Sequence, residues 1–269
     1  MSRISRMVAE SKLAPIAAFP LRLAAVGGYN VRQIGASARW LVNSREHTNY
    51  TFNLTPLNRE HLAWFIANVT GLSVAEMRGY FREIEEDERL RNVVEMATVR
   101  SARRRLADPV PKWHKRLGWY ALVRSMKPDH VVETGTDKGL GSLVFAAALL
   151  RNESGRLTTI DTNPESGYLI HGEYADVIDR RIGSSIDVIN ELSNVEMFLH
   201  DSLHTFEYET AEFECIAPRL TPRAVILSDN SDVTAALPNW AEKTGRRFAY
   251  FHERPADHWF PGGGIGVAW

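Results

Sequence analysis

The sequence contains a single cysteine, six lysines and no apolar run long enough to cross a membrane. With Cys215 alone, neither an internal disulfide nor a zinc site built from several cysteines can form, and a reducing, cytoplasmic environment is expected. The 269 residues carry 32 basic and 33 acidic side chains, so a net charge of −1 provides no general attraction to nucleic acid. A composition of 44% hydrophobic and 24% charged residues excludes a collagen-like or disordered chain.

An apolar stretch near the N-terminus runs from Leu13 to Leu21 and contains two prolines. It is too short to span a bilayer and lacks the small-residue cleavage site of a signal peptide. We expect an N-terminal arm that packs on a partner or on the rest of the protein, with contact to a membrane surface as the alternative. Stable membrane insertion is not expected.

Residues 58–105 have the apolar spacing of helices. Gly71 is placed to end one helix, and Ser73 with Glu76 has the spacing of a capping box that begins the next. The prolines at 109 and 111 indicate a linker. We therefore predict a mainly helical N-terminal region, residues 1–111, that acts as a lid, as an oligomerisation surface or as both.

From residue 112 onward, short β-rich runs alternate with helical segments. The predicted strands are 130–134, 157–161, 180–183, 195–201, 224–229, 248–253 and 264–269. This alternation predicts an α/β domain over 112–269, a Rossmann-like, doubly wound, mostly parallel sheet of seven strands covered by helices on both faces. The last two runs are joined by a turn-rich segment, so we expect them to pair antiparallel at one edge.

The first predicted strand leads into a glycine-rich loop, GTDKGLGS, that is followed by a helix. Glycines allow a sharp turn and a close approach to a ligand, but the spacing differs from the G-x-G-x-x-G of dinucleotide-binding proteins. Glu133, at the end of this strand, would repel a pyrophosphate and favours a cationic ligand. Asp161, at the end of the second strand, is placed to accept both hydroxyls of a ribose. A ligand-free turn and a helix cap are the alternatives.

Polar side chains also follow the fourth and fifth predicted strands. Asp201 ends the fourth strand, and Asp229 with Asn230 ends the fifth. Because parallel strands open to one crevice, these three oxygen ligands predict a site for Mg²⁺ or another divalent cation. His204, with an ordinary pKa near 6.5, is the candidate general base for a hydroxyl acceptor. A structural histidine that caps the next helix is the alternative.

The motifs VVETGTDKGLGS, TTIDTNP and RRIGSS resemble the first three motifs of the class I S-adenosylmethionine-dependent methyltransferases. The resemblance implies S-adenosylmethionine as the cofactor, with its methionine part along the first loop, its ribose on Asp161 and its adenine near Ser184 and Ser185. Ser142 is expected near the methionine carboxylate. The cofactor-binding residues it implies are Glu133, Gly135, Thr136, Ser142, Asp161, Ser184 and Asp201.

The predicted metal site is similar to that of the metal-dependent O-methyltransferases, both the catechol type and the macrolide-sugar type. In these enzymes an Asp after strand four and an acidic or Asp-Asn pair after strand five hold the metal. The segment DSLHTFE resembles their D-x-D-H-S-Y-E stretch, with Leu203 in place of the second acid. Catechol-type enzymes carry a lysine where His204 stands. The resemblance implies in-line transfer of a methyl group to an oxygen nucleophile.

The acceptor is predicted to be a hydroxyl of a saccharide or of a glycosylated small molecule. Residues 47–59 are rich in Asn, Thr and Tyr, which hydrogen-bond sugar hydroxyls. Trp119 and Tyr120 either stack on a sugar or pack against the sheet. Structural or surface roles are expected for His252 and His258, with lining of the acceptor pocket as the alternative. A homo-oligomer, with a dimer favoured, is expected. The alternative functions are a metal-independent methyltransferase and a non-catalytic nucleoside-binding or assembly protein.

Overall fold

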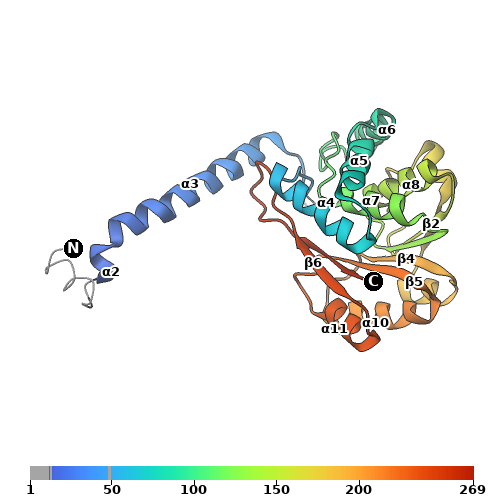
Figure 1. Cartoon of the computed structure of the whole chain (residues 1–269). Coiled ribbons are helices and arrows are strands. Elements are labelled where there is room, and N and C mark those ends of the chain that lie inside the picture. Colours follow the sequence, from blue (N-terminus) through green and yellow to red (C-terminus); the bar gives the residue numbers. More distant parts are fainter. Residues whose placement is uncertain (1–11, 13, 48–49) are drawn as a thin grey trace. The chain divides into compact units, whose positions relative to one another are not determined.

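The structure, a computed structural model, describes residue 12, residues 14–47 and residues 50–269. The chain forms two compact units (Figure 1). One unit comprises the N-terminal segment up to Ser44 together with Asp257–Trp259. The other comprises Arg45–Ala256 and Phe260–Trp269 and contains the whole sheet.

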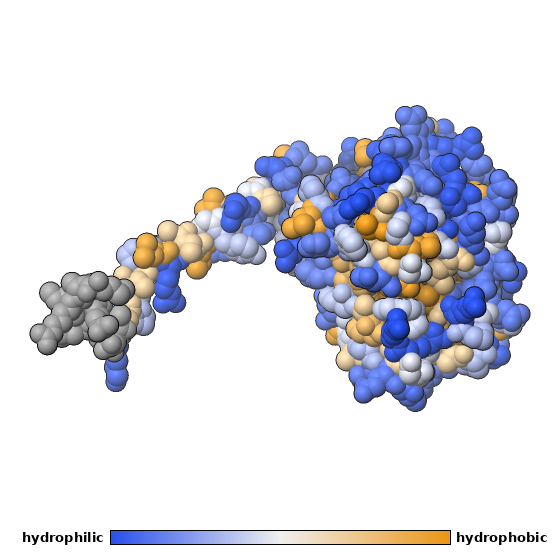
Figure 2. Space-filling view, in the orientation of Figure 1, coloured by the Kyte–Doolittle hydropathy of each residue, from blue (hydrophilic) through white to orange (hydrophobic). Residues whose placement is uncertain are grey.

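Two helices, α2 (Ala14–Ala17) and α3 (Phe19–Asn43), make up most of the N-terminal unit. The ring of Trp40 packs edge-on against Trp259, with ring centroids 5.5 Å apart. Helix α3 buries none of its residues, and apolar side chains are visible along it (Figure 2). Leu13, the first residue of the predicted apolar stretch, lies outside the described residues. Within the described residues, no helix combines the length and apolar character that a membrane span requires.

A seven-stranded sheet forms the centre of the second unit, in the order β3-β2-β1-β4-β5-β7-β6. Strands β1 to β5 run parallel, and β7 is antiparallel to both of its neighbours, β5 and β6. The strands are β1 (His130–Thr134), β2 (Arg156–Asp161), β3 (Ile178–Ile182), β4 (Val195–His200), β5 (Leu220–Asp229), β6 (Phe248–His252) and β7 (Gly264–Ala268). All seven predicted strands are therefore present, and the predicted fold class is confirmed.

Helices cover both faces of this sheet because side chains alternate along each strand. Val131 of β1 belongs to the core under α7 (Arg116–Met126) and α8 (Leu140–Asn152). Its neighbour Val132 belongs to the opposite core, under α9 (Ser185–Asn190), α10 (Phe206–Ile216) and α11 (Ala236–Thr244). Two short 3₁₀ helices, η1 (Gly172–Val177) and η2 (Ala217–Arg219), precede β3 and β5. The central strands β1, β2 and β4 are thus buried on both sides, whereas the edge strands β3 and β6 are mostly exposed or half-buried.

The predicted helical stretch contains three helices, α4 (Pro56–Thr70), α5 (Val74–Glu85) and α6 (Glu88–Arg100). The break between Gly71 and Ser73 was predicted, whereas the break at Glu86–Asp87 and the end at Arg100 were not. Gly71 caps α4 in the left-handed conformation, with φ of 73°. Ser73 and Glu76 form the expected capping box at the start of α5. Gly71 and the capping box therefore determine where α4 ends and where α5 begins.

Helix α4 packs closely on α7, and the absence of a side chain at Gly118 permits it. A Cβ at Gly118 would lie 3.1 Å from Leu62 and 3.2 Å from Ile66. Leu62 and Ile66 are both fully buried. The compact unit that holds the sheet begins at Arg45, so α4, α5 and α6 belong to it, and the predicted linker around Pro109 and Pro111 lies inside this unit.

Candidate functional site

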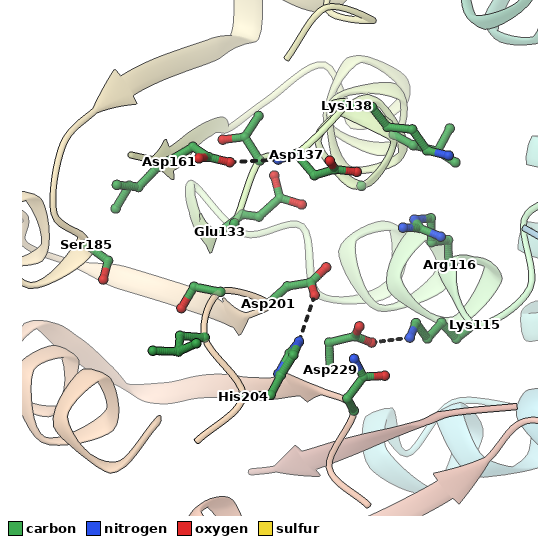
Figure 3. Close-up of a pocket in the computed structure, with 18 of the residues that line it drawn as sticks. Lys115, Arg116, Glu133, Asp137, Lys138, Asp161, Ser185, Asp201, His204 and Asp229 are labelled. Atoms are coloured by element: carbon green, nitrogen blue, oxygen red, sulfur yellow. Dashed lines mark hydrogen bonds and ion pairs between the residues drawn. The ribbon is translucent and has the colours of Figure 1, made fainter. Parts of the chain in front are cut away.

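A cavity of about 790 Å³ opens at the carboxyl ends of the parallel strands in the second unit (Figure 3). The strand register explains its composition. Thr134 of β1 pairs with Ile160 of β2 and with His200 of β4, which in turn pairs with Ser228 of β5. The next position on each strand forms a row across the sheet: Asp161, Gly135, Asp201 and Asp229. All four of these residues line the cavity.

Gly135 occupies the middle of this row, where a side chain has no room. Its φ is 87°, and a Cβ at this position would overlap the backbone carbonyl of Asp201. Its amide donates to the carbonyl of Ile160, at 2.8 Å, which holds the turn after β1 against β2. The predicted glycine loop is therefore required by the close approach of two strand-end loops.

Glu133 is buried at the end of β1 and faces the first loop. Its carboxylate accepts hydrogen bonds from the hydroxyls of Ser142 and Thr159, the latter at 2.7 Å. Burial raises the pKa of Glu133 to about 7, although both hydroxyls favour the ionised form. Glu133, Gly135 and Thr136 line the cavity, whereas Ser142 is fully buried behind Glu133 and does not. Ser142 therefore acts through Glu133 rather than by lining the site.

Asp161 is held by the backbone of the two loops beside it. Its carboxylate oxygens accept from the amides of Asp137 and Asn163, each at 2.8 Å. Because these bonds fix the carboxylate at the cavity wall, it is oriented toward a ligand before one binds. Farther along this wall, Ser185 lines the cavity and its hydroxyl lies 2.8 Å from that of Tyr208. Ser184 instead precedes α9 as its N-cap residue and is not part of the lining.

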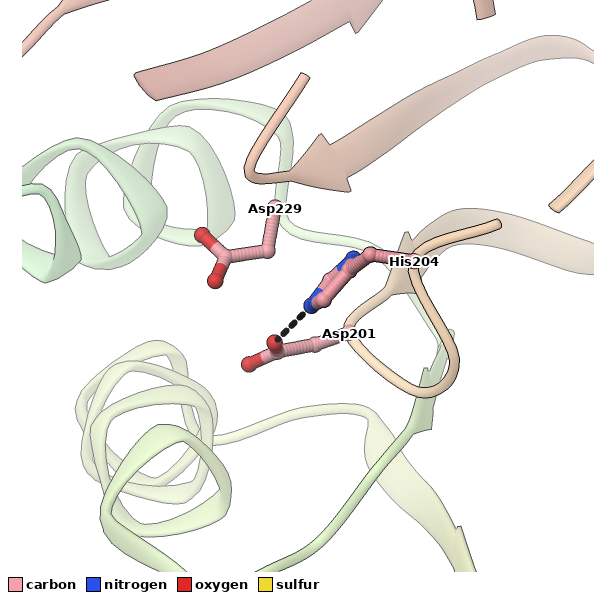
Figure 4. A group of neighbouring side chains, drawn as sticks. All are labelled: Asp201, His204 and Asp229. Atoms are coloured by element: carbon pink, nitrogen blue, oxygen red, sulfur yellow. Dashed lines mark ion pairs between the residues drawn. The ribbon is translucent and has the colours of Figure 1, made fainter. Parts of the chain in front are cut away.

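Three predicted metal-site and base residues converge at the other end of the cavity. The ligand atoms of Asp201, His204 and Asp229 all lie within 4.8 Å of one another (Figure 4). Nε2 of His204 lies 3.6 Å from Oδ1 of Asp201. Asn230, with φ of 50°, and Leu203 also line the cavity. The sequence therefore predicted a real cluster, brought together by β4 and β5.

The structure adds two buried groups that the sequence analysis did not identify, Lys115 and Glu253. The ammonium of Lys115 forms an ion pair with Asp229 and lies 3.7 Å from Oε2 of Glu253 (Figure 3). Oε1 of Glu253 accepts from Nδ1 of His114 and from the amide of Lys115, both at 2.9 Å. Lys115 precedes α7, and Glu253 follows β6, so only the folded chain brings them together.

The electrostatics of this cluster are dominated by burial and by the proximity of two carboxyl groups. Burial and then the negative charge of Asp229 raise the pKa of Asp201 to about 8. For Asp229, burial acts in the same sense, but the ion pair with Lys115 keeps its pKa below the usual value. Burial opposes protonation of His204, yet the hydrogen bond and charge of Asp201 raise its pKa. The cluster therefore contains one carboxyl group, that of Asp201, whose ionised form its neighbours stabilise poorly.

The chemistry of these side chains suits a divalent cation. Asp201, Asp229 and Asn230 supply oxygen atoms, which Mg²⁺ prefers. The raised pKa of Asp201 shows that a second positive charge beside it would be stabilised. Among the described residues, Nδ1 of His204 is buried without a hydrogen-bond partner, so this imidazole is not fully committed to the fold. Asp201, Asp229 and Asn230 therefore suit a divalent cation.

The remaining wall is aromatic and basic. Tyr50, Phe52, Phe260 and Arg116 line it, together with His114. Tyr50 and Phe52 come from the Asn/Thr/Tyr-rich segment 47–59, of which residues 48 and 49 lie outside the described residues.

Trp119 and Tyr120 take the packing role that the sequence left open. Trp119 stacks on Phe145 with ring centroids 5.6 Å apart, and the Tyr120 hydroxyl donates to Glu83 at 3.1 Å. Neither of them lines the cavity. A sugar-stacking role for these two residues is therefore wrong, because both are buried in the helical layer.

Comparison with known proteins gives the class of the domain. Residues 132–231 match a family model described as a methyltransferase domain. The O-methyltransferase TomG from Streptomyces achromogenes, solved with S-adenosylmethionine, is 19% identical with a TM-score of 0.52, over 68% of this chain and 89% of that one. A methyltransferase from Geobacter sulfurreducens is 16% identical with a TM-score of 0.50, over 66% and 87%.

A curated relative, the uncharacterized protein y4gI of Sinorhizobium fredii, is 25% identical over 172 residues. The match covers 54% of this chain and 19% of that protein, so the chain spans about a fifth of the relative's length. Together with the strand order, the match over residues 132–231 shows that this part of the chain resembles a methyltransferase domain of the class I fold. The resemblance drawn from its three motifs is confirmed.

The first prediction concerns the close approach at Gly135. Gly135→Ala should destabilise the protein by more than the roughly 1–2 kcal/mol that a left-handed backbone costs an alanine, because the new Cβ also meets the Asp201 carbonyl. Gly245→Ala is the matched control, since Gly245 has φ of 69° and open space around its Cβ. Urea unfolding measures both losses. Equal losses for the two variants would contradict the steric argument.

The second prediction concerns the pH dependence of stability at Glu133. Its folded-state pKa of about 7 lies above the ordinary value of 4.5, so the folded state retains a proton that the unfolded chain releases. Stability should therefore fall as pH rises from about 4.5 to 7, by up to about 3 kcal/mol, and then level off. The measurement is the free energy of unfolding of the native protein minus that of Glu133→Gln across this range. A difference that stays constant with pH would refute it.

Proposed function

We propose that this protein is an S-adenosylmethionine-dependent O-methyltransferase that uses Mg²⁺ or another divalent cation and acts on a hydroxyl of a saccharide or glycosylated small molecule. One observation carries the proposal. It is supported by the row Asp161, Gly135, Asp201 and Asp229, because all four residues line one cavity and their side chains suit a ribose at one end and a cation at the other.

The cofactor part of the proposal rests on the ends of β1 and β2. An anchored carboxylate at Asp161 suits the two hydroxyls of a ribose. An acidic group at Glu133 suits the methionine end of the donor, which carries a sulfonium and an amino group, better than it suits a pyrophosphate. The absence of a side chain at Gly135 lets the first loop lie against the Asp201 carbonyl, and Gly135 itself lines the cavity. TomG, which has this fold, was solved with S-adenosylmethionine.

The metal part rests on Asp201, Asp229 and Asn230, which would hold the divalent cation. When bound, that cation would lower the pKa of the acceptor hydroxyl and fix its direction. The two carboxylates and the amide come from adjacent loops, so their spacing is set by the β4–β5 pairing rather than by a flexible segment. Nucleophile and methyl donor would thereby be oriented in one cavity, which accounts for much of the rate of such transfers.

His204 is proposed to take the proton of the acceptor hydroxyl. The reaction breaks the sulfonium–methyl bond, forms the methyl–oxygen bond and leaves the proton on the imidazole. Asp201, 3.6 Å from Nε2, stabilises the imidazolium that results. The aromatic faces of Tyr50, Phe52 and Phe260 beside polar and basic groups support a saccharide as the acceptor class.

A second candidate function is metal-independent methyl transfer in the same cavity. The observation that favours it is the ammonium of Lys115, which is buried and already paired with Asp229. In this candidate, Lys115 supplies the positive charge beside the acceptor. His204 takes the proton of the acceptor, and binding in one cavity orients the acceptor toward the methyl donor. The two candidates differ in their response to a chelator, because only the first loses turnover when divalent cations are removed.

The third prediction tests the cofactor. Titration of S-adenosylhomocysteine into the protein should give micromolar binding, and Asp161→Ala should weaken it at least tenfold because two ribose hydrogen bonds are lost. Asp176→Ala, at an exposed aspartate outside the cavity, is the matched control and should bind normally. Calorimetry reports both affinities. If the native protein binds no S-adenosylhomocysteine, the proposed function is overturned.

The fourth prediction tests the metal ligands. Titration of Mg²⁺ into the S-adenosylhomocysteine complex should give a binding signal that Asp201→Asn removes, because one of two carboxylate ligands is lost. The affinity for S-adenosylhomocysteine should change little in this variant. Asp187→Asn, an exposed acid, is the control. No Mg²⁺ signal in the native protein, together with turnover that survives EDTA, would select the metal-independent candidate.

A further inference from the structure

Carboxyl groups outnumber ammonium groups around Lys115. Three carboxyl groups, those of Asp201, Asp229 and Glu253, meet at this end of the cavity, and the ammonium of Lys115 faces two of them. Lys115 and Glu253 are almost completely buried, with side chains 7% and 1% exposed. One ammonium therefore serves two carboxyl groups, Asp229 and Glu253, while Asp201 beside them is paired with His204.

Lys115 also stands at an unfavourable place for a cation. It immediately precedes α7, where the partial positive charge of the helix N-terminus opposes an ammonium. Burial of its side chain adds a desolvation cost that surface lysines avoid. A lysine that bears both costs must be compensated by its carboxylate partners, and the chain offers it two.

Glu253 is fixed so that it can receive the ammonium. His114 and the Lys115 amide hold Oε1, each at 2.9 Å, and they leave Oε2 directed toward the ammonium at 3.7 Å. Arg116, the next basic group, is occupied elsewhere: its guanidinium contacts His114 and lies over the ring of Trp119. A rotation of the lysine side chain alone would therefore exchange Asp229 for Glu253 as its partner.

We propose that Lys115 holds Asp229 before a divalent cation binds and transfers to Glu253 when the cation takes its place, so that Lys115 and Glu253 together set the cation affinity of the site. This inference rests on the proposed metal site and adds a positioning pair to it. Lys115 competes with the incoming cation for Asp229, and Glu253 reduces that competition by offering the ammonium another partner.

The pair predicts opposite changes in cation affinity. Lys115→Met removes the competing charge and should tighten binding of Mn²⁺, the probe ion, by about tenfold or more. Glu253→Gln keeps the hydrogen bonds to His114 and to the Lys115 amide but removes the alternative partner, so it should weaken Mn²⁺ binding by roughly tenfold. Lys243→Met, at an exposed lysine paired with Glu214 at 3.0 Å, is the matched control and should leave the affinity unchanged.

The double variant distinguishes a transfer of the ammonium from a general effect of charge. If Glu253 acts through Lys115, Glu253→Gln should alter Mn²⁺ affinity no more than about threefold in the Lys115→Met background. Calorimetry with the full chain measures all four forms, and thermal unfolding with S-adenosylhomocysteine binding verifies that each is folded. Equal weakening by Glu253→Gln in both backgrounds, or no tightening by Lys115→Met, overturns the proposal.

The failure of the metal site itself has a different signature. Suppose that the native protein and Lys115→Met both bind S-adenosylhomocysteine but that neither binds Mn²⁺. That result overturns the metal site and the Lys115 proposal and leaves the methyltransferase proposal intact. If S-adenosylhomocysteine binding is absent as well, the proposed function falls. Binding of Mn²⁺ by Lys115→Met but not by the native protein would support the competition directly.

Discussion

The candidate site depends on the register of four parallel strands. Toward their carboxyl ends β2, β1, β4 and β5 pair in one register, beyond the irregularity between Val195 and Met197 of β4. Asp161, Gly135, Asp201 and Asp229 therefore occupy equivalent positions just after the paired segments. Neighbouring strands lie about 4.8 Å apart, so these side chains are close without any long loop to carry them. A slip of one residue in any strand would turn its acid toward the opposite face. Gly135 lies between Asp161 and the two acids of the metal-type cluster, and the carbonyl of Asp201 occupies the space that a side chain there would need.

Much of this row could be predicted because each member is adjacent to its strand in the sequence. An apolar run that ends in an acid indicates both the strand and the functional position, and fold rules then place the ends of parallel strands together. The same local logic fails for Lys115 and Glu253. Lys115 precedes the first strand and Glu253 follows the sixth. They meet because β7 lies between β5 and β6, so that the end of β6 lies near the start of α7. Nothing in a local pattern connects residues 138 positions apart.

The roles of Ser142 and Ser184 show a related limit. Motif position indicates which residues lie near a ligand, but one residue of displacement on a helix changes the face. Ser142 points behind the wall to Glu133, and Ser185 rather than Ser184 reaches the cavity. The predicted boundary at residue 111 also differs from the division into compact units, in which the unit with the sheet begins at Arg45. Prolines mark a break in secondary structure, whereas a compact unit is defined by packing, and Leu62 and Ile66 pack against Gly118 across that break.

The two candidate functions differ in the position of one ammonium group. With Lys115 on Asp229, the acid is neutralised and the cavity has its own positive charge beside the acceptor. With Lys115 on Glu253, Asp229 joins Asp201 as a pair of oxygen ligands whose mutual repulsion is relieved by a divalent cation. The raised pKa of Asp201 shows that the first arrangement leaves one carboxyl group poorly stabilised in its ionised form. In the proposed exchange, a single buried lysine with two carboxylate partners would therefore connect a metal-free cavity to a metal-binding one.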